Sequence, residues 1–148
     1  MSLTLTIRNA RGVIYSGAIT NEYLFTPTDY GVYRFIYTAT DSSNRKLETT
    51  YLVTIKDRIS PVLTILGEVP ASANFEGTVN LPLASVTDNY DEEVRLWLFV
   101  LGPNGELRAL KEGELSFIAK LRGEYVITYF AQDSYNNYSS QSFKIIVG

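Results

Sequence analysis

The chain has 148 residues, a formal net charge of −3, no cysteine and no histidine. Because these two side chains are absent, the protein cannot form a disulfide, a cysteine metal site or a Ser-His-Asp or Cys-His catalytic group, and we expect no enzyme activity. It has no run of five like charges and no apolar stretch as long as the roughly 18 residues of a membrane span, so we expect neither a nucleic-acid partner nor membrane insertion.

The composition favours strands over helices. Eleven tyrosines and seven phenylalanines accompany many valines, isoleucines and threonines, and these residue types fit the pleated, half-buried surface of a β-sheet. Only residues 105–112 have a helix-like composition, and that stretch is too short for a stable helix. The expected fold class is all-β.

An internal repeat divides the chain. Residues 31–44, GVYRFIYTATDSSN, align without a gap on residues 123–136, GEYVITYFAQDSYN, and seven of the fourteen positions are identical. A gapless register of this kind indicates two copies of one folding unit. The spacing of 92 residues also pairs Phe25 with Phe117, Tyr51 with Phe143, Val53 with Ile145 and Ile55 with Val147, and one residue of slip pairs residues 5–7 with residues 98–100.

The two copies differ in length before the matched region. Residues 60–94 precede it in the second copy, whereas only residues 1–3 precede it in the first. We therefore predict a partial module at residues 1–58, with only the last five strands, and a complete seven-stranded module at residues 59–148. Pro61 fits this boundary, because proline cannot donate to a strand ladder and suits the first residue of a strand.

The complete copy contains seven short stretches with strand character, separated by turn signals. This spacing predicts a sandwich of two sheets. In the sixth stretch Tyr125, Ile127 and Tyr129 share one face, since side chains alternate along a strand, and we expect that face to form the core. The predicted strands are residues 62–66, 78–83, 94–101, 106–110, 114–119, 125–133 and 140–147.

Two local motifs occur in both copies and predict structural roles. Leu121-x-Gly-x-Tyr125 resembles the tyrosine corner of β-sandwiches, in which the phenol bonds to nearby backbone, and Tyr33 has the matching place in the first copy. The alternative for both residues is a plain core tyrosine. The motif Asp-Ser-x-Asn, at residues 41–44 and 133–136, predicts side-chain bonds that fix the last hairpin; a shared binding role is the alternative.

The repeated segments, each followed by an alternating last strand, resemble bacterial immunoglobulin-like repeats, which are tandem immunoglobulin-like or fibronectin III-like β-sandwich modules. The segment VTDNYDEEVRLWLFVLGPNGEL, residues 86–107, resembles the middle of the same repeats. The resemblance implies tandem immunoglobulin-like sandwiches, the first truncated at its N-terminal strands. It carries no catalytic residues, because such repeats have no shared catalytic set.

The family resemblance implies a non-catalytic pair of structural, spacer or adhesion modules from a larger bacterial cell-surface or secreted protein. The alternative is a carbohydrate-binding accessory module of an extracellular enzyme. Expected partners are neighbouring domains of the parent protein and a protein or glycan ligand. The first residues do not form a signal peptide, so the protein is either cytosolic or a segment of a longer chain. The resemblance implies the second, with an extracellular or cell-surface location.

The most polar cluster is a candidate calcium site. Asp88, Asn89, Asp91 and Glu92 offer side-chain oxygens at close spacing, and calcium takes six to eight oxygen ligands. The alternative is a solvated loop whose side chains bond to turn backbone groups. We expect no other cofactor.

Three aromatic residues are candidates for a partner or ligand surface. Tyr135 and Tyr138 flank the last turn, and aromatic loop residues can stack on sugars or anchor a protein. Trp97 lies in a stretch that is apolar on both faces, so one face exceeds what a half-solvated sheet needs. The structural alternative for Trp97 is a core tryptophan. The open sheet edges of the partial first module also predict self-association.

Overall fold

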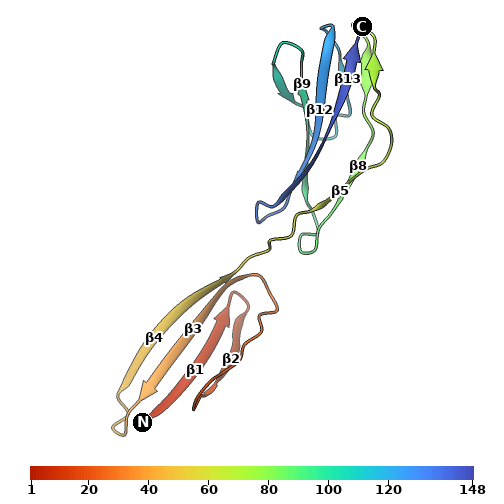
Figure 1. Cartoon of the computed structure of the whole chain (residues 1–148). Helices are drawn as coiled ribbons and strands as arrows, with labels where there is room; N and C mark the ends of the chain where they lie inside the picture. The colour runs from red at the N-terminus through yellow and green to blue at the C-terminus, as the bar shows by residue number, and fades with distance from the viewer. The chain divides into compact units, whose positions relative to one another are not determined.

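The structure is a computed structural model that describes residues 1–148. It divides into two compact units, Met1–Asp57 and Arg58–Gly148 (Figure 1). Both units are built from β-strands, and nearly all neighbouring strands run antiparallel. No helix of the structure is long and apolar enough to cross a membrane. The chain is all-β, with two β-units in tandem.

The first unit is one antiparallel sheet in the order β2-β1-β3-β4. It has four strands, whereas the sequence predicted five. The missing strand is the counterpart of residues 114–119, which in the second unit pair with a strand that the first unit lacks. Residues 19–30 therefore run without strand pairing. The strands are β1 (Ser2–Asn9), β2 (Gly12–Ala18), β3 (Gly31–Thr40) and β4 (Lys46–Ile55).

The core of the first unit is small. Only Leu5, Ile7 and Tyr33 are fully buried hydrophobic residues, and they lie on one face of the sheet. Phe25, from the segment without strands, contacts the rings of Tyr33 and Phe35 at centroid distances of 5.2 and 5.5 Å. This segment covers the part of the face formed by β1 and β3, and strand β4 remains exposed along almost its whole length.

The second unit has nine strands, two more than the sequence predicted. A five-stranded sheet, β10-β9-β12-β13-β6, faces two strand pairs, β5-β8 and β7-β11. The additional strands arise from short pairings that alternation does not reveal. The strands are β5 (Val62–Ile65), β6 (Ser72–Ala73), β7 (Thr78–Asn80), β8 (Ala84–Thr87), β9 (Arg95–Leu101), β10 (Leu107–Ala109), β11 (Ser116–Ile118), β12 (Gly123–Gln132) and β13 (Tyr138–Val147).

Pro82 explains one of these differences. Within the stretch predicted as a strand at residues 78–83 only β7 (Thr78–Asn80) forms, and it pairs with β11; β8 (Ala84–Thr87) follows and pairs with β5. Pro82 lies between the two and cannot donate a ladder hydrogen bond. The chain therefore changes its strand partner at this residue.

The strand pairs cover the inner face of the five-stranded sheet and are tied to it by side-chain hydrogen bonds. Leu63 and Val79 belong to the same buried cluster as the inner residues of β9, β12 and β13. The fully buried Tyr129 donates from its hydroxyl to the carbonyl of Pro82 at 2.7 Å. Gln141 Nε2 donates to the carbonyl of Leu63 at 2.9 Å.

Tyr129 predicts a loss of stability at high pH. Burial raises the pKa of its phenol above the ordinary value of 10.0. Because the folded pKa exceeds the unfolded one, the stabilisation is fully present below about pH 10 and is lost as pH rises through the folded pKa.

We expect Tyr129→Phe to reduce the fall in the free energy of unfolding between about pH 9 and 11, because the phenol whose pKa is raised by burial is removed. Urea unfolding across this range measures the slopes. Identical slopes in wild type and Tyr129→Phe would contradict the assignment.

Candidate functional site

The Asp-Ser-x-Asn motif forms the same braced turn in both units. In the second unit Asp133 is buried, and its Oδ1 accepts hydrogen bonds from the backbone N–H groups of Tyr135 and Asn137, both at 2.8 Å. Its Oδ2 accepts from Asn137 Nδ2 at 2.7 Å. Asn136 has a φ of 67°, a left-handed conformation that asparagine tolerates. The motif therefore stabilises the turn between β12 and β13.

Asp41 repeats this arrangement between β3 and β4. Its Oδ1 accepts from the backbone N–H groups of Ser43 at 2.8 Å and Arg45 at 3.0 Å, and Asn44 has a φ of 60°. The backbone hydrogen bond from Arg45, aided by that residue's side chain and by Ser43, holds the pKa of Asp41 below its ordinary value of 3.8. Equivalent contacts in both units favour a structural role over a binding role.

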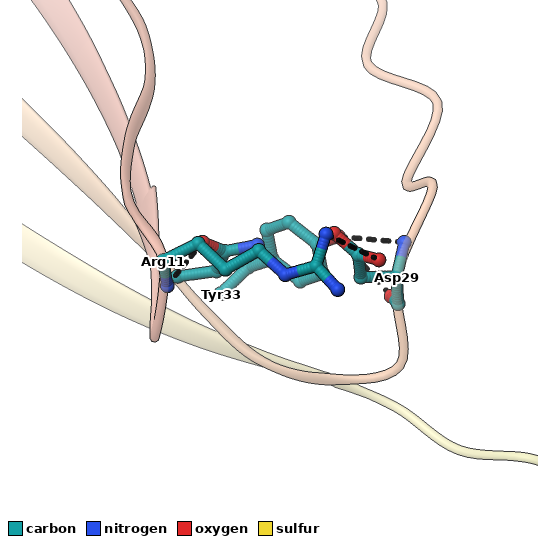
Figure 2. A network of polar contacts seen from close by, with 4 residues as sticks. Arg11, Asp29 and Tyr33 are labelled. Carbon is teal, nitrogen blue, oxygen red and sulfur yellow. Dashed lines mark hydrogen bonds and ion pairs between the residues drawn. The ribbon is translucent and has the colours of Figure 1, made fainter. Parts of the chain in front are cut away.

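The two tyrosines also bond to equivalent backbone positions. The hydroxyl of Tyr125 accepts from the backbone N–H of Leu121 at 3.0 Å. The hydroxyl of Tyr33 accepts from the N–H of Asp29 and donates to its carbonyl, both at 3.1 Å (Figure 2). Arg11 approaches the Asp29 carboxylate at 3.5 Å, but its side chain is exposed, so this ion pair adds little stability. Each phenol fixes the segment that leads into its central strand.

The residues of the candidate calcium site do not all converge. Asp91 uses both carboxylate oxygens on Ser134, accepting from the backbone N–H at 2.6 Å and from Oγ at 2.8 Å. Asp88 Oδ2 accepts from the backbone N–H groups of Tyr90 and Asp91 at 3.0 and 2.9 Å. Asn89 and Glu92 are exposed. Asp91 therefore braces the loop against the β12–β13 turn.

One oxygen in this loop lacks a protein partner. Oδ1 of Asp88 is buried and makes no hydrogen bond. A carboxylate oxygen of Asp88 also lies within 4.8 Å of a carboxylate oxygen of Asp133. Two carboxylates so close together repel each other unless a cation or a proton lies between them.

Trp97 is not a core residue, so the prediction of a core tryptophan at this position is wrong. In β9 the core-facing side chains are Leu98 and Val100, and Trp97 and Phe99 lie on the opposite, outer face. Trp97 is paired with Phe130 of β12, which is also outside the core cluster. The core needs no tryptophan here, because the strand pairs already cover the inner face.

Four aromatic residues form a strip on this outer face. Phe130 is its centre, because the ring of Tyr138 stacks on it at 5.4 Å and that of Trp97 lies 5.6 Å away. Phe99 contacts the same ring at 6.4 Å. Tyr138 is 59% exposed. We call these four residues the aromatic strip. Sequence reasoning named Trp97 and Tyr138 as candidates for a partner or ligand surface, but it did not name Phe130, which period-two alternation places on the outer face.

Tyr135, the third candidate, does not join the strip. Its ring contacts that of Tyr90 at 5.8 Å, beside the acidic loop. The structure thus separates the predicted aromatic surface into two places, the outer sheet face and the β12–β13 turn.

The chain was compared with known proteins. No family model and no curated protein matches it. Among solved structures, it is similar to the fibronectin(III)-like modules of CbhA from Clostridium thermocellum, with a TM-score of 0.48 and 20% sequence identity, over 97% of this chain and 77% of that one.

The brace between Asp91 and Ser134 predicts a local loss of stability. We expect Asp91→Ala to lower the free energy of unfolding of the second unit by about 1–2 kcal/mol, because charge-assisted hydrogen bonds to Ser134 are lost. The exposed Glu93→Ala should leave it unchanged. Urea unfolding in the presence of chelator measures both variants, and equal stability of the two would remove the structural role of Asp91.

Proposed function

We propose that the chain is a non-catalytic pair of β-modules, an open four-stranded sheet followed by a β-sandwich, in a larger bacterial cell-surface or secreted protein, where it serves as a spacer or adhesion segment. The observation that carries this proposal is that its polar side chains form structural hydrogen bonds. Asp41, Asp91, Asp133, Tyr33 and Tyr125 all bond to nearby backbone groups, so they fix turns and strands. Its expected partners are the neighbouring domains of the parent chain.

A fold braced in this way suits a mechanical role. The bonds link each sheet to its own turns, and no cysteine is needed to stabilise them. Cysteine-free secreted modules are natural in bacterial proteins, whereas small animal modules usually contain disulfides. This reasoning supports a bacterial extracellular or cell-surface location.

Carbohydrate binding is the second candidate function, and the aromatic strip favours it. Flat sugar faces stack on aromatic rings, which offer large contact areas at low cost in conformational entropy. Trp97 and Tyr138 flank Phe130 on one sheet face, and Tyr138 is largely exposed. A protein ligand could use the same surface, because aromatic residues are also enriched at protein interfaces.

One experiment separates these functions. The full chain is incubated with a panel of cell-wall and plant polysaccharides, and both retention and release of soluble sugars are measured. The spacer proposal predicts neither retention nor hydrolysis. Retention that Trp97→Ala abolishes and the exposed Leu83→Ala preserves would replace it with the carbohydrate-binding candidate. Hydrolysis by purified chain would contradict both.

We also propose that the acidic loop of the second unit binds calcium through Asp88. Its buried Oδ1 has no hydrogen-bond partner, and a carboxylate oxygen of Asp133 lies within 4.8 Å of one of its own. Calcium–oxygen distances are about 2.3–2.6 Å, so one ion can contact both carboxylates. Bound calcium would offset their mutual repulsion and hold the loop against the β12–β13 turn.

Thermal unfolding tests the calcium proposal. We expect calcium to raise the midpoint of the second unit relative to chelator, because a ligand that binds only the folded state stabilises it. Asp88→Asn should remove this rise, and Glu93→Gln, in an exposed residue of the same loop, should keep it. An unchanged midpoint, or a rise that survives Asp88→Asn, would contradict the proposal.

A further inference from the structure

The sheet of the first unit has two chemically different faces. Strand register places Leu5, Tyr37 and Thr49 side by side on one face, and Ile7, Phe35 and Tyr51 next to them. We call this the inner face; the strand residues on it include no charged side chain. The opposite face carries charges on three strands, at Arg8, Arg34, Lys46 and Glu48.

The repeat shows that this inner face has the residue pattern of a buried surface. Val53 corresponds to Ile145, which is completely buried in the second unit, yet Val53 is 42% exposed. Tyr37 corresponds to Tyr129, which is completely buried and tied to Pro82. The pairs β5-β8 and β7-β11 cover these positions in the second unit, and the first unit has no equivalent strands. Exposed apolar surface of this kind marks an interaction site.

The uncovered part of the face is an open hollow lined mainly by aromatic and apolar residues. Phe35, Tyr37, Thr49, Tyr51 and Val53 line an open hollow of about 640 Å³. The ring of Tyr51, one of these lining residues, meets that of Tyr37 edge-on at 5.9 Å, and Tyr51 is still 60% exposed. An uncharged, aromatic surface of this kind can pack against a second copy of itself related by a two-fold axis.

We propose that two copies of the chain associate through the inner faces of their first units, so that each sheet covers the other. Two sheets packed face to face form a sandwich with a shared core about 10 Å thick. Since the face carries no charge, self-association brings no like charges together. The lining rings of Phe35, Tyr37 and Tyr51 in the two copies would then face one another and gain aromatic contacts.

The size of the uncovered face sets the expected affinity of the dimer. Strands β3 and β4 each have ten residues, so the uncovered strip is about 30 Å long and roughly 15 Å wide. Two such strips bury about 1,000 Å² in total, which is at the low end for specific interfaces. The dimer should therefore dissociate on dilution.

Thr49 and Thr50 give a matched pair of test positions. They are adjacent in β4, are the same residue type and are both exposed. Thr49 lines the hollow of the inner face, whereas Thr50 points to the opposite face beside Ile36. A lysine at either position can keep its charge in solvent in the monomer, but only lysine at 49 would be enclosed in the proposed dimer.

Sedimentation velocity of the full chain, from about 10 to 500 μM, tests the proposal, which predicts a reversible monomer–dimer equilibrium over this range. We expect Thr49→Lys to raise the dimer dissociation constant at least about tenfold and Thr50→Lys to change it less than about twofold. Circular dichroism checks that both variants are folded. A wild-type chain that stays monomeric over the range would overturn the proposal.

A wild-type dimer to which both variants respond equally would also overturn it, because pairing of β4 edges or association through the second unit does not distinguish the two faces. The outcome is independent of the polysaccharide assay, whose key residue lies in the second unit.

Discussion

A β-sheet with one apolar face must have that face covered, and the rest of this structure depends on how the constraint is met. In the second unit the strand pairs β5-β8 and β7-β11 cover the five-stranded sheet, with Leu63 and Val79 in one core with the sheet residues. Polar contacts such as the bond from Tyr129 to Pro82 keep the cover in register. In the first unit a segment without strands covers only part of the equivalent face, and a core of three buried residues results.

The repeated polar motifs show that local hydrogen bonds and long-range packing contribute separately to the fold. Asp41 and Asp133 brace equivalent turns, and Tyr33 and Tyr125 bond to equivalent backbone positions. The local hydrogen bonds that fix the turns and strands are thus present in both units, whether or not the sheet is covered. The two units differ in long-range packing, because no strands cover the sheet of the first unit and its core is small. This difference connects the internal repeat to the proposed association of two copies.

Sequence reasoning predicted the elements whose signals are local or repeated. The sixth strand, expected at residues 125–133, is β12 (Gly123–Gln132), and its inner residues were expected in the core. It could not predict features that depend on distant partners. Pro82 signals an interrupted ladder, but nothing local shows that β8 then pairs with β5. Nor does any local signal show that Asp91 bonds to Ser134, or that Trp97 lies outside a core already filled by other strands. Alternation separates two faces, but tertiary packing decides which face is buried.

The most direct test of this account is amide hydrogen exchange at matched positions of the two copies, measured at a concentration low enough to keep the chain monomeric. Exchange protection reports the free energy of local opening, which rises with buried contacts. The account predicts strong protection around Ile145 in β13 and much weaker protection around Val53 in β4, although both amides lie in ten-residue strands paired along their length. Equal protection at the two positions would show that the first sheet is as stable without its cover, and would contradict the central claim.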